Sequence, residues 1–187
     1  LIADPSDTTD GNASFTQIMG DANLITVNFN PAADRLRVIS NTGQNLRINV
    51  DTGATITDGT INLATGSAAV VAGAYTNAFA GTGSTKLYSI DQNSDRIYLQ
   101  NANAGTLGNS TALGADINTN GGGGFDIDPV NNVGFAALKL ASGNYKFFKL
   151  NLANVGTSSD AVFESHDLNN SFNSMGIRGI ALKRSTD

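Results

Sequence analysis

The sequence predicts an all-β protein, built as a β-propeller-like arc of about three to four antiparallel blades. Three observations predict this fold. Apolar and polar residues alternate over short runs, turn-forming residues separate the runs, and the whole arrangement recurs at intervals of roughly 50 residues. One small sheet cannot bury both of its faces, so such repeats are expected to stack against each other around an axis.

The first repeat begins with a strand expected over residues 24–29, which the pair Asn30-Pro31 closes. A hairpin follows, with strands expected over residues 35–40 and 45–50 and a turn at residues 41–43. The second of these strands alternates apolar and polar side chains at every position. This period of two is typical of a strand with one buried face, and Asn-Thr-Gly is typical of the turn between two strands.

The same arrangement of one strand and one hairpin recurs twice. The second repeat predicts strands over residues 70–75, 86–90 and 96–100, and the third predicts strands over residues 124–127, 133–138 and 145–150. A last strand-like run, residues 176–183, has no hairpin after it. The whole chain is therefore expected to be a single propeller-like domain or the C-terminal part of one. Its repeats lie near residues 24–69, 70–120 and 121–175, with an orphan strand at 176–183.

About three blades are fewer than the four or more of closed propellers, so an arc is expected rather than a ring. The alternative is an ordinary sandwich or barrel with irregular loops. The composition favours strands and turns over helices in either case. Glycine occurs 21 times, and Glu164 is the only glutamate among 16 acidic residues, although helices usually favour glutamate.

Composition excludes several classes of function. The chain has 187 residues, 40% of them hydrophobic, which is enough apolar material for one core. It has no cysteine, which excludes disulfides and cysteine metal clusters. Eleven Lys and Arg face 16 Asp and Glu, so nucleic-acid binding through a general basic surface is not expected. No apolar run approaches the length of a membrane helix, so no membrane span is expected.

The chain starts at Leu1 with no Met, basic stretch or apolar signal segment. A leader is therefore expected to have been removed, or the chain is part of a longer one. The lack of cysteine, the few lysines and the many Thr and Asn fit an exported bacterial protein, outside the cell or on its surface. Asn-X-Ser/Thr triplets match glycosylation acceptors and matter only in a eukaryotic source; they start at Asn12, Asn109 and Asn169.

Residues 29–47, from Phe29-Asn30-Pro31 to Leu46-Arg47, resemble a bacterial domain of unknown function, family 4394. Further segments resemble it as well: residues 74–77, 87–91, 100–101, 103–107 and 124–127. The resemblance covers roughly residues 15–182. It implies a propeller-like repeat fold in exported bacterial proteins and supplies no activity, substrate or catalytic residue. It also implies additional repeats upstream, which are missing here, so the chain is a fragment or something else supplies the missing neighbour.

No converging catalytic set emerges from the sequence, and no enzyme is predicted. The only histidine, His166, is expected on a surface loop, and a single histidine excludes a histidine-rich zinc site. Asp126 and Asp128 would share one face of a strand, as glycosidase carboxylates could, but their expected task is to cap the following turn. Four consecutive glycines, Gly121–Gly124, lack the Lys-Ser or Lys-Thr of a phosphate loop and are expected to provide a flexible approach to Phe125.

Calcium binding is the most specific chemical hypothesis that the sequence supports. Asp91, Asn93 and Asp95 place oxygen ligands at alternate positions, as in the first half of a calcium loop. Arg96 then stands where such a loop needs glycine, and no glutamate follows at the twelfth position. The alternative is a hairpin turn made of turn-forming residues. The polar run over residues 4–12 presents the same choice.

Two clusters of side chains suggest ligand-binding surfaces. Arg35, Arg37 and Arg47 could bind an anionic sugar or phosphate; the alternative places them on solvated strand faces, paired with Asp34 or Asp51. The aromatic residues lie mostly in strand patterns, where core packing is their ordinary role. Tyr88 and Tyr98 could instead face a sugar.

Two functions of different classes follow. The first is an exported, non-catalytic module with a structural, adhesive or self-assembling role, because an open arc leaves sheet faces and strand edges uncovered at both ends. Its expected partners are other copies of itself or a missing N-terminal segment. The second is a propeller that binds a carbohydrate, such as a glycan, or another small ligand, with calcium as a possible support.

Overall fold

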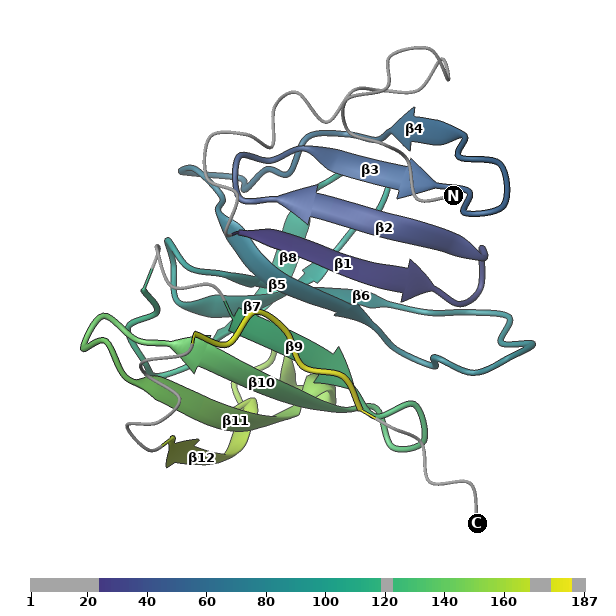
Figure 1. Cartoon of the computed structure of the whole chain (residues 1–187). Helices are drawn as coiled ribbons and strands as arrows, with labels where there is room; N and C mark the ends of the chain where they lie inside the picture. The colour runs from purple at the N-terminus through teal and green to yellow at the C-terminus, as the bar shows by residue number, and fades with distance from the viewer. Residues whose placement is uncertain (1–23, 119–122, 169–175, 183–187) are drawn as a thin grey trace.

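The computed structural model describes residues 24–118, 123–168 and 176–182. This part of the chain folds into three four-stranded antiparallel sheets, and each sheet is a meander in which consecutive strands are neighbours (Figure 1). Sheet 1 holds β1 (Ile25–Asn30), β2 (Arg35–Ser40), β3 (Asn45–Ile48) and β4 (Thr55–Thr57). Sheet 2 holds β5 (Val70–Tyr75), β6 (Leu87–Asp91), β7 (Arg96–Gln100) and β8 (Leu107–Ala112). Sheet 3 holds β9 (Gly123–Ile127), β10 (Val133–Lys139), β11 (Tyr145–Asn151) and β12 (Val162–Asp167).

The turns that follow β1 and β9 are built in the same way. The side-chain oxygen of Asn30 accepts the amide of Ala32, and that of Asp128 accepts the amide of Val130. Proline is the next residue in both turns. Four residues after the capping side chain, both turns have a positive φ, at Asp34 and at Asn132, which the short polar side chains of Asp and Asn tolerate. This equivalence fixes the alignment of the first and third repeats.

The three sheets stack in sequence order, with sheet 2 in the middle (Figure 1). Their first strands lie next to each other, because β5 contacts β1 on one side and β9 on the other. The residues buried between sheets 2 and 3 form the largest apolar cluster, which includes Ile90, Ile97, Phe148 and Leu150. A smaller cluster between sheets 1 and 2 joins Ile39 to residues of β5 to β8. First strands around a common line, with sheets packed face to face, are the arrangement of propeller blades.

The predicted all-β, propeller-like arc is confirmed, and the only helical residues in the described part are one 3-10 turn at Leu152–Asn154. All nine strands predicted in the three repeats are present, with bounds that differ by at most two residues. The sequence patterns did not predict the fourth strand of each sheet, namely β4, β8 and β12. The described residues contain no helix that is long and apolar enough to span a membrane.

The predicted orphan strand is not a paired strand. Residues 176–182 have no regular secondary structure, and residue 183 lies outside the described part. The segment, yellow in Figure 1, runs alongside β9 across the outer side of sheet 3. No strand in the described part of the chain pairs with it.

Candidate functional site

A buried ion-pair network joins sheet 1 to sheet 2. Arg37 on β2 donates to Asp58 at 2.6 Å, and Arg47 on β3 donates to the other oxygen of Asp58 at 3.0 Å. The side chain of Arg37 is only 2% exposed. It also donates to the hydroxyl of Tyr75 at 3.2 Å and to the side-chain oxygen of Asn103 at 3.1 Å, both from the second repeat. The side-chain oxygen of Asn45 is a fourth acceptor, at 2.8 Å. Because its donors reach acceptors in both repeats, this buried guanidinium holds the two repeats together.

The prediction that these arginines pair with Asp34 or Asp51 on solvated faces is wrong for Arg37 and Arg47. Their partner is Asp58, which follows β4 and is 7% exposed. The loop after β4 returns over the face of sheet 1 that sheet 2 covers, and this return brings the carboxylate between the two guanidinium groups. The network leaves no open arginine cluster for an anionic ligand at β2 and β3.

Within the described residues, no other sheet packs against the opposite face of sheet 1. Residues directly opposite each other in an antiparallel pair share a face, so the registers of β1, β2 and β3 define an outer face of seven apolar residues. These are Ile25, Val27, Phe29, Leu36, Val38, Leu46 and Ile48. Val27 is 54% exposed and Phe29 is 47% exposed. Val38, Leu46 and Ile48 of the same face form a buried cluster and are at most 6% exposed, so the exposed part of the face is its β1 side. Large apolar side chains exposed together in this way are typical of a surface that is covered in the working assembly.

The junction between β1 and β5 is made by side chains of β1 that bond the backbone of β5. The hydroxyl of Thr26 accepts the amide of Gly73 at 2.8 Å and donates to its carbonyl at 3.2 Å. The side-chain oxygen of Asn28 accepts the amide of Tyr75 at 3.1 Å. The amides of the free edge of β5 are therefore satisfied by polar side chains rather than by another strand.

The segment 176–182 meets β9 through the equivalent positions. Asp126, which aligns with Asn28, accepts the amide of Leu182 at 2.7 Å. Gly124, which aligns with Thr26, lies directly against the backbone, because a Cβ atom on Gly124 would come 2.4 Å from the nitrogen of Ile180. The glycine run is therefore needed at this point for a close approach. Gly121 and Gly122 lie outside the described residues.

The two acidic residues proposed as a carboxylate pair have separate structural tasks. Asp128 caps its turn as predicted, with one oxygen on Val130 and the other accepting the side-chain amide of Asn131. Asp126 instead bonds Leu182 and its own neighbour Ile127.

Each predicted calcium ligand has a hydrogen-bond partner within the protein. Asp91 is fully buried; one oxygen accepts the amide of Ala69, and the other accepts both the amide and the hydroxyl of Ser94. Asn93 donates to the carbonyl of Ser67, and Asp95 accepts the amide of Ile117 at 2.7 Å. The calcium interpretation remains a prediction that only a titration addresses. The second candidate, residues 4–12, lies outside the described residues.

The remaining site candidates stand apart from one another. His166 is exposed, as expected, but lies on β12 rather than in a loop. Within the described ranges, no group of three His, Cys, Asp or Glu side chains could hold a metal ion. Tyr88 and Tyr98 are both buried, and Tyr88 also forms part of the wall of a hollow between sheets 2 and 3. Tyr88 donates to the carbonyl of Leu152 at 3.3 Å, and its burial raises the pKa of the phenol.

Of the three asparagines that match glycosylation acceptors, Asn109 is exposed on β8, whereas Asn12 and Asn169 are outside the described residues.

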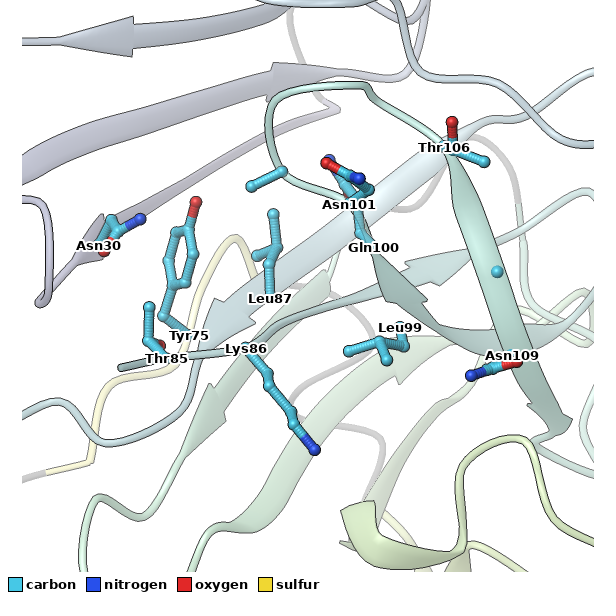
Figure 2. Close-up of a pocket in the computed structure, with 12 residues that line it drawn as sticks. Asn30, Tyr75, Thr85, Lys86, Leu87, Leu99, Gln100, Asn101, Thr106 and Asn109 are labelled. Atoms are coloured by element: carbon cyan, nitrogen blue, oxygen red, sulfur yellow. The ribbon is translucent and has the colours of Figure 1, made fainter. Parts of the chain in front are cut away.

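A hollow of about 530 Å³ lies where the strands of sheet 2 end (Figure 2). Tyr75, Leu87 and Leu99 give it apolar walls, and amides such as Asn101 lie at its rim. A second hollow of about 610 Å³ lies between sheets 2 and 3, and Lys86 lines both. The lining of the first hollow includes this one cation and no carboxylate. Hydroxyl-rich or acidic small molecules are the ligands that such a lining suits. Sequence patterns did not indicate these hollows, because the residues that line each hollow come from several strands and loops that are far apart in the sequence.

The family described as "Domain of unknown function (DUF4394)" matches residues 4–180. The chain belongs to this family. The predicted resemblance is therefore confirmed, and the DUF4394 match spans all three sheets and reaches into the segment after sheet 3. Membership supplies no activity, so the function of this DUF4394 chain has to be argued from its surfaces.

Among solved structures, the DUF4394 chain is similar to the crystal structure of the β-propeller domain of Cps50 (Swd1) from Myceliophteria thermophila. The two are 15% identical, with a TM-score of 0.43, over 78% of this chain and 39% of that domain. The DUF4394 chain thus spans well under half of that propeller. At this level of similarity, the propeller-like assignment rests on the order and stacking of the three sheets themselves. None of the curated proteins matches the chain.

Proposed function

We propose that this DUF4394 chain is an exported, non-catalytic structural module that assembles with further copies through the outer face of sheet 1. One comparison of burial supports the proposal. Phe29 on β1 and Ile127 on β9 hold the same position, each directly before the Asx-Pro pair that ends its strand. Ile127 is 1% exposed because sheet 2 covers it, whereas Phe29 is 47% exposed. The β1 side of the outer face of sheet 1, at Val27 and Phe29, thus lacks the cover that sheet 2 gives to the equivalent position of sheet 3.

Head-to-tail packing is the mode of assembly that this asymmetry suits. The outer faces of sheets 1 and 3 are different surfaces, so contacts between copies would be heterologous rather than two-fold. Heterologous contacts that do not close into a ring give filaments. A structural or adhesive role outside the cell fits such an assembly, and the cysteine-free, turn-rich composition fits export.

The self-assembly proposal is tested by light scattering on size-exclusion chromatography over a range of protein concentrations. The wild-type chain is expected to associate as its concentration rises, and Phe29→Lys is expected to remain monomeric, because a charge would be buried in the contact. Val130→Lys is the matched control, since Val130 is 67% exposed in a turn away from this face. A wild-type chain that stays monomeric at every concentration would exclude the proposal.

Export is tested separately, by fractionation of the native host with an antibody against this chain. The protein is expected in the medium or on the cell surface. Recovery from the cytosol alone would contradict export and leave the assembly proposal standing.

A second candidate function is binding of a small carbohydrate or acidic ligand in the hollows that share Lys86, with calcium as a support. The specific observation in its favour is a lining of amides, apolar walls and one lysine without a carboxylate. Calorimetry against a glycan panel and against calcium tests it. Binding that Lys86→Ala weakens would support the candidate. The absence of both a binding heat and a shift in melting temperature with every ligand would exclude this candidate function. The absence of a binding heat with calcium would exclude the calcium site at Asp91, Asn93 and Asp95.

A further inference from the structure

The lining of the first hollow includes a buried amide that the fold leaves unsatisfied. Gln100 is the last residue of β7 and is only 4% exposed. It stands opposite Leu87, which stands opposite Tyr75, so the three side chains share one face of sheet 2 and line the hollow together (Figure 2). The side-chain oxygen of Gln100 accepts the hydroxyl of Ser89 at 2.6 Å, whereas its nitrogen has no hydrogen-bond partner among the described residues. An unpaired buried amide lowers stability, and a ligand oxygen that accepts from it would remove that cost.

Two asparagines of the same lining also present donors. The side-chain oxygen of Asn30 accepts the amides of Ala32 and Ala33, and that of Asn101 accepts the amide of Ala104. Because backbone amides already engage both oxygens, the part of each side chain that remains for a ligand is its NH2 group. Three of the amides around the hollow therefore offer hydrogen-bond donors rather than acceptors.

One cation stands among these donors. Lys86 directly precedes β6, is exposed and lines the hollow. No carboxylate lines the hollow, and among the described residues none forms an ion pair with Lys86. Hydrogen bonds from N–H donors to an anion are stronger than those to a neutral acceptor. The lining is thus complementary to a ligand that carries acceptor oxygens and a negative charge.

The size and the walls of the hollow indicate an organic ligand. Its volume of about 530 Å³ falls within the range of roughly 300 to 1,000 Å³ that is usual for small-molecule sites. Tyr75, Leu87 and Leu99 contribute apolar surface, which an inorganic ion would not contact favourably. A carbon skeleton with several oxygens and one negative charge matches the apolar walls, the amide donors and the single lysine.

We infer that the first hollow binds a small hydroxylated carboxylate, of which a sugar acid is the simplest example. Its carboxylate pairs with Lys86, and one of its oxygens accepts from the side-chain nitrogen of Gln100. Because this nitrogen is covered, a side chain at the exposed rim must turn aside to admit the ligand. The inference rests on the second candidate function proposed above and deepens it, since it specifies the hollow, the buried donor and the charge of the ligand.

Nuclear magnetic resonance on the wild-type chain tests the inference directly. D-glucuronate is the probe, and D-glucose, which lacks the carboxylate, is the matched neutral compound. In dilute solution of the full chain, glucuronate is expected to shift the side-chain NH2 resonances of Gln100 in a saturable way. The side-chain resonances of Asn132, which lines only the second hollow, are expected to stay in place. Glucose is expected to bind about tenfold more weakly or less, because it makes no ion pair with Lys86.

Three substitutions separate the two hollows. Gln100→Glu keeps an oxygen that accepts from Ser89 but replaces the donor, so the affinity for glucuronate is expected to fall by about tenfold or more. Lys86→Met removes the charge at an exposed position and is expected to have a similar effect on affinity without lowering the melting temperature. Phe163→Ala is the matched control, because Phe163 is 54% exposed and lines only the second hollow. If Gln100→Glu lowers the melting temperature, the resonances of wild-type Gln100 decide.

The outcomes distinguish failure of the inference from failure of the candidate function. Glucuronate that shifts Asn132 and not Gln100, or that Phe163→Ala weakens, would overturn the inference and place the ligand in the second hollow. Equal affinities for glucose and glucuronate would overturn it as well, and so would binding of a neutral glycan from the panel without binding of glucuronate. The absence of binding by glucuronate and by every member of the panel would exclude the candidate function together with the inference.

Discussion

The two junctions of the arc stack equivalent sheets with different chemistry. Between sheets 2 and 3, a continuous apolar cluster that includes Ile90 and Phe148 is buried. Between sheets 1 and 2, the apolar cluster is smaller and is supplemented by the ion pair of Arg37 with Asp58. Apolar burial stabilises a junction directly. In a buried ion pair, the attraction between the two charges is largely offset by the cost of removing both from water. The difference indicates that the junction between sheets 2 and 3 contributes most to the stability of the fold. Sheet 1 is held to sheet 2 more by specific polar contacts.

The largest effect is expected from a cavity in the apolar junction. Phe148 on β11 is 1% exposed and faces sheet 2. Phe148→Ala removes most of a buried aromatic side chain, so the free energy of unfolding is expected to fall by about 4 kcal/mol. Urea denaturation followed by circular dichroism measures it, with Phe163→Ala on the exposed strand β12 as the control. A loss below that of the control would contradict the assignment of this junction as the centre.

The ion pair is expected to respond differently to removal and to replacement. Asp58→Ala leaves the buried Arg37 without its carboxylate, which should cost about 3 kcal/mol of unfolding free energy. The double substitution Arg37→Met with Asp58→Leu replaces both charges with apolar groups. It is expected to lose less stability than Asp58→Ala, because the desolvation cost of the buried pair disappears together with its attraction, while Arg47 and the other acceptors of Arg37 still lose a partner. The same urea titration compares them, and a double variant as unstable as Asp58→Ala would refute this account of the junction.

Prediction from sequence succeeded where a strand has one apolar face and a recognisable turn. β2 and β3 alternate cleanly and are separated by Asn-Thr-Gly, so their hairpin was visible. β8 and β12 are edge strands with almost entirely exposed or partly exposed side chains. Their order comes from pairing with β7 and β11, which leaves no apolar period in their own sequence.

The junction contacts could not be predicted in the same way. The burial of Arg37 depends on Asp58 and Asn103, which come from two different repeats. Nothing in the sequence around β2 distinguishes this arginine from a solvated one. One signal was available for the other end of the arc. Asn28 and Asp126 precede the two Asx-Pro pairs by the same spacing, and this repeat predicts equivalent partners for both side chains.

The smallest effect concerns pH. Burial raises the pKa of Tyr88 above its ordinary value of 10.0. Above pH 10 the unfolded chain loses this phenolic proton while the folded chain keeps it, so the folded state is expected to lose stability as pH rises further. Tyr88→Phe removes this contribution. Urea titrations from about pH 8 to about pH 11 are expected to show a shallower loss of stability in the variant. Equal slopes would contradict the burial of a neutral phenol.

The central proposal is that the exposed β1 side of the outer face of sheet 1, at Val27 and Phe29, is covered by another copy. Because the chain contains no cysteine, Val27→Cys places a single thiol on the outer face of sheet 1, and Val130→Cys places one on a turn elsewhere. The rate of labelling with a soluble thiol reagent is the measurement, taken across protein concentration. We predict that Cys at position 27 reacts quickly in dilute solution and slowly in concentrated solution, while Cys at position 130 reacts quickly in both. A labelling rate at position 27 that does not depend on concentration would contradict the account.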